Sequence, residues 1–279
     1  MGGLLGYARV MDETRKLALI TGASSGIGFE LAKQCAEHGY DLLVNAEDTG
    51  LDIAAEELSV LGVNVEAARA DLRTGEGVEQ LYAATERPVA AAALNAGVGQ
   101  GGGFVDAGLA EQLAVVDLNV RSTLHLARLL LPDMVNRGRG KVLISSSIGA
   151  MIPGPFQAVY NASKSFLQSF AEALQNEVKD SGVTITSLMP GPTETNFFRR
   201  AGMEDTKIGQ SSKDDPAEVA EQGFRALMEG KDKVVAGSAA TKAQAAAATV
   251  APDKAKAAAH RQMAEPGSAE PATDEPTRS

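Results

Sequence analysis

A tyrosine and a lysine in the segment AVYNASKSFLQSF, residues 158–170, could together move a proton. Tyr160 and Lys164 are four positions apart, so on a helix their side chains stack on one face. A free tyrosine has a pKa of about 10, too high for proton exchange near neutrality, and a neighbouring ammonium group favours its ionisation. The pair predicts a general acid or base with a lowered pKa. The same spacing also suits a half-buried core tyrosine beside a solvated lysine.

A serine cluster and a glycine-rich turn accompany this pair. Residues 145–147 are serines that close an apolar run, and the last of them precedes Tyr160 by thirteen positions. Near the start of the chain, the turn TGASSGIG lies between an apolar run and a helical pattern. Its three glycines permit a tight turn and a close backbone approach to phosphates, which the amino end of the next helix then faces. The turn therefore predicts a phosphate-containing ligand.

Together these features resemble the short-chain dehydrogenase/reductase family, from about residue 16 to about residue 236. The resemblance implies a hydride transfer between NAD(H) or NADP(H) and a small carbonyl or alcohol substrate. In the family's roles, Tyr160 is the acid or base, and Lys164 lowers its pKa and binds the nicotinamide ribose. The thirteen-residue spacing selects Ser147 as the donor to the substrate oxygen. Asn119, in LNVRST, matches a residue whose backbone carbonyl holds a proton-relay water, although a surface helix asparagine is the simpler interpretation.

The resemblance also implies the dinucleotide contacts. The glycine spacing GxxxGxG is complete, the sequence NAG closes a strand beside the cofactor, and PGPTET resembles a segment that binds the nicotinamide amide. The residues expected at the dinucleotide are Gly22, Ser24, Ser25, Gly26, Ile27, Gly28, Glu47, Asp71, Leu72, Asn95, Ala96, Gly97, Tyr160, Lys164, Pro190, Gly191, Thr193 and Thr195.

Two acidic positions bear on the choice of dinucleotide. Glu47 lies nineteen residues after Gly28, near the distance at which an acidic residue meets the ribose hydroxyls of NAD. The aspartate of the family's NAD-preferring members matches Ala46 instead, and the arginine of many NADP-preferring members matches Glu47. Both cofactors stay open, with a slight lean to NAD(H). Glu47 could equally cap a surface loop, and Asp71 could cap the helix after it.

Two other function classes remain open. Ser24 also lies in a GxSxG pattern, the nucleophile elbow of serine hydrolases. Such an enzyme needs an acid and then a histidine downstream, and His38, His125 and His260 are all poorly placed for that role. The other class is a dinucleotide-sensing protein without catalysis, which the intact serine, tyrosine and lysine disfavour.

The composition argues against several partners. The formal charge is −10 and the pI is about 4.9, which disfavours binding to nucleic acid or to an anionic membrane. Cys35 is the single cysteine and the chain has three separated histidines, so we expect neither a disulfide nor a metal site. Residues 1–10 are apolar but lack a basic start and are too short for a signal peptide. We expect a cytoplasmic protein and, from the family resemblance, a homodimer or homotetramer.

Alternating strand and helix patterns predict an α/β, doubly wound parallel sheet, the Rossmann fold, in a single domain. Strands are expected at 17–20, 41–46, 63–70, 89–94, 141–147, 183–188 and 234–236, and one helix at 109–131. We expect a flexible extension at 1–15, the oxidoreductase domain at 16–238, and an alanine-rich, partly disordered tail at 239–279. Part of 239–263 should be helical, but this composition should bury no core. Residues 196–212 correspond to a family lid, and pocket residues expected at Pro153, Phe156, Phe197 and Phe198 hint at an apolar substrate.

Overall fold

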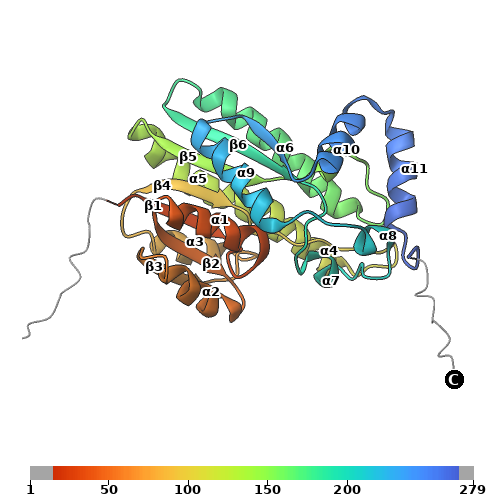
Figure 1. Ribbon diagram of the computed structural model, residues 1–279, viewed down its shortest axis with the longest axis horizontal. Helices are drawn as coiled ribbons and strands as arrows, with labels where there is room; N and C mark the ends of the chain where they lie inside the picture. Colours follow the sequence, from red (N-terminus) through yellow and green to blue (C-terminus); the bar gives the residue numbers. More distant parts are fainter. Residues whose placement is uncertain (1–14, 270–279) are drawn as a thin grey trace, which may run out of the picture.

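Seven strands form one parallel sheet in the computed structural model, which describes residues 15–269 (Figure 1). The strands are β1 (Leu17–Thr21), β2 (Asp41–Ala46), β3 (Val65–Arg69), β4 (Val89–Leu94), β5 (Gly140–Ser145), β6 (Val183–Pro190) and β7 (Lys233–Ala236). Their order is β3-β2-β1-β4-β5-β6-β7, so the chain reverses direction across the sheet between β1 and β4. A doubly wound sheet opens a ligand crevice at the carboxyl ends of the strands on either side of such a reversal. The predicted fold class is confirmed.

The alanine-rich run over residues 89–94 is a strand, as expected, despite its poor strand propensity. It lies between β1 and β5 and pairs with both in parallel. Ala91 and Ala93 are buried on one face of the sheet and Ala92 on the other. Because both faces are covered, burial in the centre of the sheet outweighs the weak intrinsic preference of alanine.

Helices cover both faces of this sheet. On one face lie α1 (Gly26–Glu37), α2 (Gly50–Ser59) and α9 (Pro216–Glu229), and on the other lie α3 (Gly75–Ala83), α5 (Ser122–Asn136) and α6 (Ala158–Val178). Each helix buries an apolar stripe, and leucines on both faces are almost fully buried. Each such side chain contributes about 1.5 to 3 kcal/mol of transfer free energy. The two helical layers stabilise the sheet, and the carboxyl ends of its strands form the edge at which the candidate site lies.

The long helix predicted over residues 109–131 is interrupted. Helix α4 (Leu109–Val116) passes into a π-helical segment, η1 (Asp117–Arg121), which continues as α5. Within η1 the amide of Ser122 donates to the carbonyl of Asp117, one residue further than in an α-helix. π-helical turns are rare and recur at functional sites. Asn119 lies in this segment and is fully buried, so the interpretation as a surface residue is wrong.

The segment after residue 238 forms two helices, α10 (Ala239–Val250) and α11 (Asp253–Ala264), at one end of the molecule (Figure 1). The expectation that this composition buries no core is wrong here, because Ala245, Ala248 and Ala264 are buried. Small side chains let these helices pack closely, α10 near β7 and η2 (Ile148–Met151) and α11 near α8 (Lys207–Gln210). Residues 1–14 and 270–279, where a flexible extension and a disordered end were predicted, lie outside the described residues.

Asp214 joins α10 to the sheet. Its carboxylate accepts hydrogen bonds from the hydroxyl of Thr241 at 2.5 Å and the amide of Ser238 at 3.1 Å. Burial acts to raise the pKa of Asp214, but these hydrogen bonds outweigh it and lower the pKa. The buried carboxylate is therefore stabilised by donors from the amino end of α10. Across residues 15–269, no helix combines the length and the apolar character needed to cross a membrane.

Removing one donor to Asp214 should loosen this attachment. Replacement of Thr241 by Val keeps the side-chain shape but leaves a buried carboxylate oxygen without its donor, so we expect the free energy of unfolding to fall by about 1 to 3 kcal/mol. Urea denaturation measures this change. Thr249→Val is the matched control, because the Thr249 hydroxyl donates to a carbonyl within the same helix and the residue is exposed. Equal losses in the two variants would contradict the prediction.

Candidate active site

The glycine-rich turn between β1 and α1 forms one wall of a cleft. Gly22 and Gly26 have φ angles of +67° and +58°, a region that side-chain-bearing residues rarely adopt. A Cβ at Gly28 would lie 2.0 Å from the carbonyl oxygen of Gly22, so the first turn of α1 packs directly on the turn. Helix α1 begins at Gly26 and directs free amides towards the cleft. This backbone suits the pyrophosphate of a dinucleotide.

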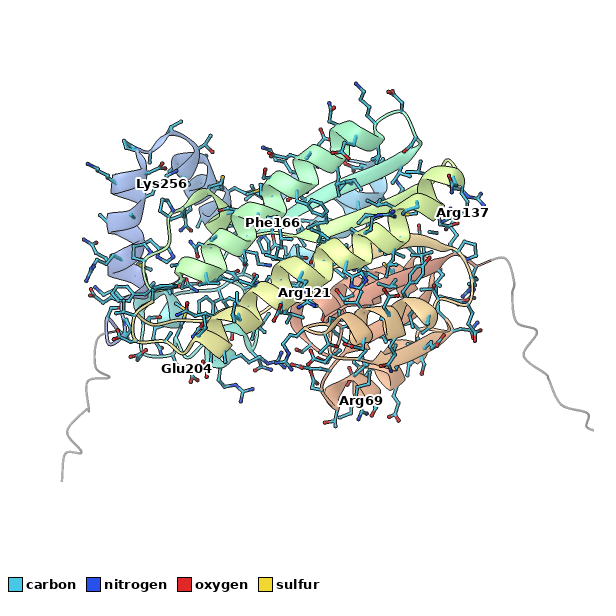
Figure 2. The ribbon with its side chains drawn as sticks, turned by 180° about the vertical axis from the view of Figure 1, so that it is seen from behind. Arg69, Arg121, Arg137, Phe166, Glu204 and Lys256 are labelled. Carbon is cyan, nitrogen blue, oxygen red and sulfur yellow. The ribbon has the colours of Figure 1, made fainter. Side chains whose placement is uncertain are left out.

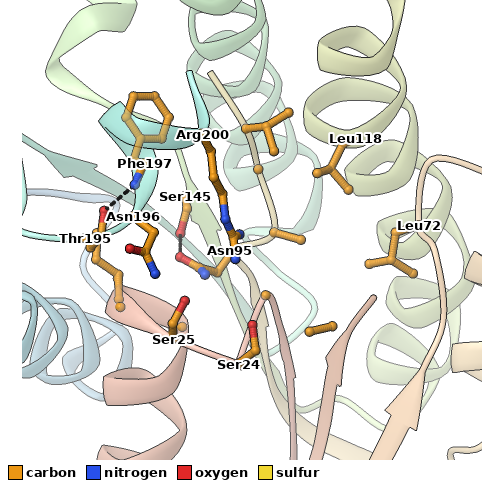
Figure 3. A pocket seen from close by; sticks show the side chains of 18 of the residues that line it. Ser24, Ser25, Leu72, Asn95, Leu118, Ser145, Thr195, Asn196, Phe197 and Arg200 are labelled. Atoms are coloured by element: carbon orange, nitrogen blue, oxygen red, sulfur yellow. Dashed lines mark hydrogen bonds between the residues drawn. The ribbon is translucent and has the colours of Figure 1, made fainter. Parts of the chain in front are cut away.

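Most of the predicted dinucleotide contacts line this one cleft, which we call the first cleft (Figure 3). Gly191 and Thr193 do not; they line an adjoining space, the second cavity. The predicted residues that line the first cleft are Gly22, Ser24, Ser25, Gly26, Ile27, Gly28, Glu47, Asp71, Leu72, Asn95, Ala96, Gly97, Tyr160, Lys164, Pro190 and Thr195. Segments far apart in the chain therefore converge as the sequence predicted, at the carboxyl ends of the central strands.

Asn95 connects the ends of β1, β4 and β5 beneath the cleft. Its side-chain amide donates to the carbonyl of Thr21 at 3.2 Å. Its Oδ1 accepts from the hydroxyl of Ser145 at 3.0 Å, as Figure 3 shows. The hydroxyl of Thr21 accepts from the backbone amides of Asn95 and Ala96. With their polar groups paired in this way, the strand ends form a fixed floor for a bound ligand.

Acidic side chains gather where β2 ends. Glu47 and Asp71 both form ion pairs with Arg73, and the hydroxyl of Ser24 donates to Asp48 at 2.8 Å. The hydrogen bond from Arg73 holds the pKa of Asp71 below its usual value. Glu47, Asp48 and Asp71 all line the cleft, whereas Arg73 does not. This end of the cleft is therefore lined by three carboxylates and one arginine, Arg200, whose guanidinium lies 3.8 Å from the Asp48 carboxylate.

Tyr160 lies in the wall that the first cleft shares with the second cavity. Burial raises its pKa to about 12, and a hydrogen bond with Ser147 partly opposes the shift. The prediction that Lys164 lowers the pKa of Tyr160 is therefore wrong for the protein alone. The lysine Nζ lies 5.8 Å from the centre of the tyrosine ring and donates to the carbonyl of Ser145 at 2.8 Å. At that separation burial dominates, and the phenol stays protonated at neutral pH.

Lys164 is itself strongly affected by its surroundings. It is 5% exposed, and burial lowers its pKa to about 8 because desolvation disfavours the ammonium form. Its Nζ also lies near Gly97, where an added Cβ would be 3.4 Å away. The lysine is thus mostly charged at pH 7 and close to losing its proton. A group in this state responds to small changes in its environment.

Asn119 is close to this group but lines neither space. Its side-chain amide donates to the carbonyl of Val98 and to the hydroxyl of Ser163, each at 2.9 Å, and its Oδ1 accepts from the amide of Val98 at 2.9 Å. Ser163 in turn donates to the backbone carbonyl of Tyr160 at 2.6 Å. The asparagine therefore fixes the position of the loop after β4 relative to the tyrosine helix.

The second cavity is mainly apolar. Its polar end is formed by Ser147 and Tyr160, and Phe197 and Phe198 of the predicted lid form part of its wall. The two phenylalanines belong to α7 (Phe197–Arg200), and the ring of the first packs at 5.1 Å from the ring of Tyr160. Pro153 and Phe156, also expected at the substrate pocket, do not line it; Phe156 packs instead in a cluster with Phe198 and Met203.

Several lining residues were missed by the sequence prediction. Asp48 and Arg200 line the first cleft, and Gln244 and His260 of the tail line the second cavity. Asp48 is adjacent to the predicted Glu47, so its position just after β2 could have predicted that it lines the cleft. Arg200 and the two tail residues follow no motif, and only the packing of distant segments brings them to the site.

The hydrolase alternative has no base. Ser24 contacts the carboxylate of Asp48, but each histidine has a partner elsewhere: His38 contacts the carbonyl of Gln34, His125 contacts Glu79, and His260 contacts the carbonyl of Pro155. Within the described part of the chain, no group of three or more histidine, cysteine or acidic side chains could hold a metal ion. The geometry thus favours a dinucleotide-binding turn over a nucleophile elbow.

Comparisons with known proteins agree with this geometry. A family model described as short chain dehydrogenase matches residues 16–205. The uncharacterised oxidoreductase YmfI of Bacillus subtilis (strain 168) is 34% identical over 188 residues, which cover 66% of this chain and 78% of that protein. A short-chain dehydrogenase from Sphingobium yanoikuyae, solved in complex with NADPH, is 28% identical with a TM-score of 0.73, covering 79% of this chain and 87% of that one. A short-chain dehydrogenase/reductase from Burkholderia phymatum, solved in complex with NAD, is 25% identical with a TM-score of 0.71, covering 79% and 88%.

The region matched by the family model extends over most of the sheet and includes the glycine-rich turn, Ser147, Tyr160 and Lys164. The similarity therefore spans both the fold and the residues that line the first cleft. The chain belongs to the short-chain dehydrogenase/reductase family and is an oxidoreductase.

Proposed function

We propose that this oxidoreductase transfers a hydride between a nicotinamide dinucleotide and a small carbonyl or alcohol substrate. The dinucleotide would occupy the first cleft, against the glycine turn and the strand ends, and supply or accept the hydride when bound. Similar proteins solved with NADPH and with NAD support this assignment. The backbone of Gly22, Gly26 and Gly28 supports it independently, since side chains at these positions would meet strain or backbone atoms.

One observation carries the proposal: Tyr160 lies between the two spaces, with Lys164 on the side of the first cleft and Ser147 on the side of the second cavity. A substrate oxygen in the second cavity could accept hydrogen bonds from both Ser147 and Tyr160. Its carbon would then face the first cleft. Proximity of this kind lets proton transfer at the oxygen accompany hydride transfer at the carbon.

The protonation state of Tyr160 favours its role as a proton donor. With a pKa near 12 in the protein alone, the phenol carries its proton at neutral pH and can donate it to a carbonyl oxygen during reduction. Lys164 would stabilise the resulting phenolate with its ammonium charge and would bind the nicotinamide ribose. Asn119 would hold the loop after β4 in a fixed position relative to α6 and maintain the proposed proton path.

The acidic end of the first cleft supports a lean to NAD(H). The carboxylates of Glu47, Asp48 and Asp71 can accept hydrogen bonds from ribose hydroxyls but would repel a 2′-phosphate. Arg73 is close, but its guanidinium group is engaged by two of these carboxylates.

A homodimer or homotetramer is part of the proposal. Large apolar side chains remain exposed on α4, α5 and α6, among them Leu113, Leu124 and Phe166, which are 50%, 45% and 39% exposed. Figure 2 shows Phe166 on this helical face, together with Arg121 at the start of α5. Apolar residues gathered on one face suit burial against a second subunit.

Replacing Tyr160 by Phe should remove the proton donor and preserve the ring. We expect turnover of a ketone with the reduced dinucleotide to fall by about 10² or more, while dinucleotide affinity, measured by fluorescence titration, stays within a few-fold. Tyr82→Phe is the matched control, because that half-buried tyrosine lies outside both spaces. Turnover near that of the unmodified protein in Tyr160→Phe would refute the role.

The rate of reduction should depend on the charge of Lys164. Because its pKa is lowered to about 8, the ammonium form is complete well below pH 8 and is lost as the pH rises through that value. We therefore expect kcat/KM for reduction to decline above about pH 8. In Lys164→Met this decline should be absent and the rate lower at every pH. A profile that stays flat to pH 10, or a decline retained in the variant, would contradict the prediction.

Cofactor preference should change when Glu47 loses its charge. In Glu47→Gln, repulsion of the 2′-phosphate falls and Arg73 is partly released, so we expect the affinity for NADPH to rise by about 5-fold or more relative to that for NADH. Titration with each dinucleotide measures the ratio. Asp52→Asn serves as the control, since Asp52 is exposed, pairs with Arg69 and does not line the cleft. A ratio unchanged from the unmodified protein would remove the basis for the lean to NAD(H).

A further inference from the structure

The polar side chains that line the second cavity are few, and the described ones include no aspartate, glutamate, lysine or arginine. Its walls are apolar, and Ser147 and Tyr160 supply its reactive end. An ion entering this space would lose its hydration without gaining an opposite charge, which is costly. The cavity therefore suits an uncharged molecule.

His260, from α11, is the titratable group in this lining besides Tyr160. Its Nδ1 lies 3.1 Å from the backbone carbonyl oxygen of Pro155. A carbonyl can only accept a hydrogen bond, so Nδ1 must carry the ring proton. In the neutral ring, Nε2 then presents a lone pair and acts as an acceptor. Burial lowers the pKa of His260, against the effect of the Pro155 contact, so the ring is neutral at neutral pH.

Packing contacts of α11 hold the His260 ring in place. Arg261 lies over the ring of Phe156, 5.1 Å from its centre, which joins α11 to the turn before α6. Ala264, at the end of α11, packs in a cluster with Phe198 and Met203 of the lid region. These contacts hold α11, and His260 with it, against the turn before α6 and the lid region.

The other polar side chains of the second cavity do not specifically require a hydrogen-bond donor on the bound molecule. The amides of Gln157 and Gln244 each offer both a donor and an acceptor. Asn161 donates from its amide to the carbonyl of Ile152 at 3.0 Å, and its buried Oδ1 has no hydrogen-bond partner among the described residues. Nε2 of His260 likewise has none within residues 15–269. Unlike the Asn161 oxygen, Nε2 is not fully buried, so a molecule in the cavity could donate a hydrogen bond to it.

We propose that the second cavity takes an uncharged, largely apolar ketone or secondary alcohol that carries an additional hydroxyl group, and that Nε2 of His260 accepts the hydrogen bond of that hydroxyl. This inference rests on the proposed function, because the reacting oxygen is assigned to Ser147 and Tyr160. It names the substrate class and makes His260 a specificity-determining residue. The hydroxyl would supply a donor to Nε2, which has no hydrogen-bond partner among the described residues.

Two sets of three ketones test the proposal. The sets differ in the distance between the carbonyl group and the added hydroxyl group. One comprises benzylacetone and its para-hydroxy and para-methoxy forms, and the other comprises alpha-tetralone with the same substituents para to the carbonyl. Only the hydroxy form of each set donates a hydrogen bond. Calorimetric titration into enzyme saturated with the oxidised dinucleotide measures binding without turnover. We expect the hydroxy form of at least one set to bind about 3-fold to 10-fold more tightly than its methoxy form.

Substitutions at His260 locate the effect. Asn can place its amide nitrogen where Nδ1 lies and keep the Pro155 contact, but it has no atom at the Nε2 position, so the preference for the hydroxy form should vanish in His260→Asn. Gln has a polar atom near the Nε2 position and should retain part of the preference. Gln262→Asn, on an exposed position of the same helix, should leave it unchanged. If His260→Asn lacks a cooperative thermal transition, His260→Phe, which keeps the ring and removes both nitrogens, provides the same comparison.

Failure of the His260 assignment can be distinguished from failure of the proposed function. No preference for the hydroxy form in either set, or a preference that persists in His260→Asn or His260→Phe, overturns the assignment to His260. Reduction of the same ketones tests the proposed function on its own, because Tyr160→Phe should lower turnover by about 10² or more yet keep the binding preference. Hydroxyl preference that depends on His260 supports the inference.

Discussion

The buried ammonium group of Lys164 is the interaction on which the site depends. It joins α6 to the end of β5 through the carbonyl of Ser145, and Ser145 also donates to Asn95 at the end of β4. A charge this deeply buried is stable only when its hydrogen bonds are satisfied, and its lowered pKa expresses that cost. The lysine therefore fixes the tyrosine helix against the strand ends and at the same time brings a positive charge to the floor of the first cleft.

The position of Tyr160 follows from this attachment. With α6 fixed at Lys164, one turn earlier the phenol falls in the wall between the two spaces. The surroundings differ on its two sides: carboxylates and free amides line the first cleft, whereas apolar side chains line most of the second cavity. A polar dinucleotide and a less polar substrate can thus be held by different chemistry while their reacting atoms meet at one hydroxyl. The high pKa of Tyr160 in the protein alone shows that burial, rather than the lysine charge, sets its protonation state before ligands bind.

The sequence predicted the sheet and most of the first cleft because these depend on local patterns. Apolar runs, a glycine turn with fixed spacing and the tyrosine–lysine pair each occupy a short segment, and parallel strands bring their carboxyl ends to one edge. The π-helical turn at Asn119 was not predicted, since it differs from an α-helix by a single hydrogen-bond register. The pKa of Tyr160 was predicted in the wrong direction because the spacing of two residues gives neither the 5.8 Å separation nor the extent of burial. Residues of the tail were missed at the site because their composition carries no motif.

The two spaces differ in how much of their lining lies within the region that the family model matches. The family model covers residues 16–205, which include the whole first cleft and the reactive end of the second cavity. The lining residues beyond that range, Ile208, Gln244 and His260, all belong to the second cavity. Asp214 joins the helix that carries Gln244 to the sheet, and Ala264 anchors the helix that carries His260. Under the proposed function, residues at the sheet edge would carry out the chemistry. The two alanine-rich helices, α10 beside β7 and α11 beside α8, would contribute to substrate selection.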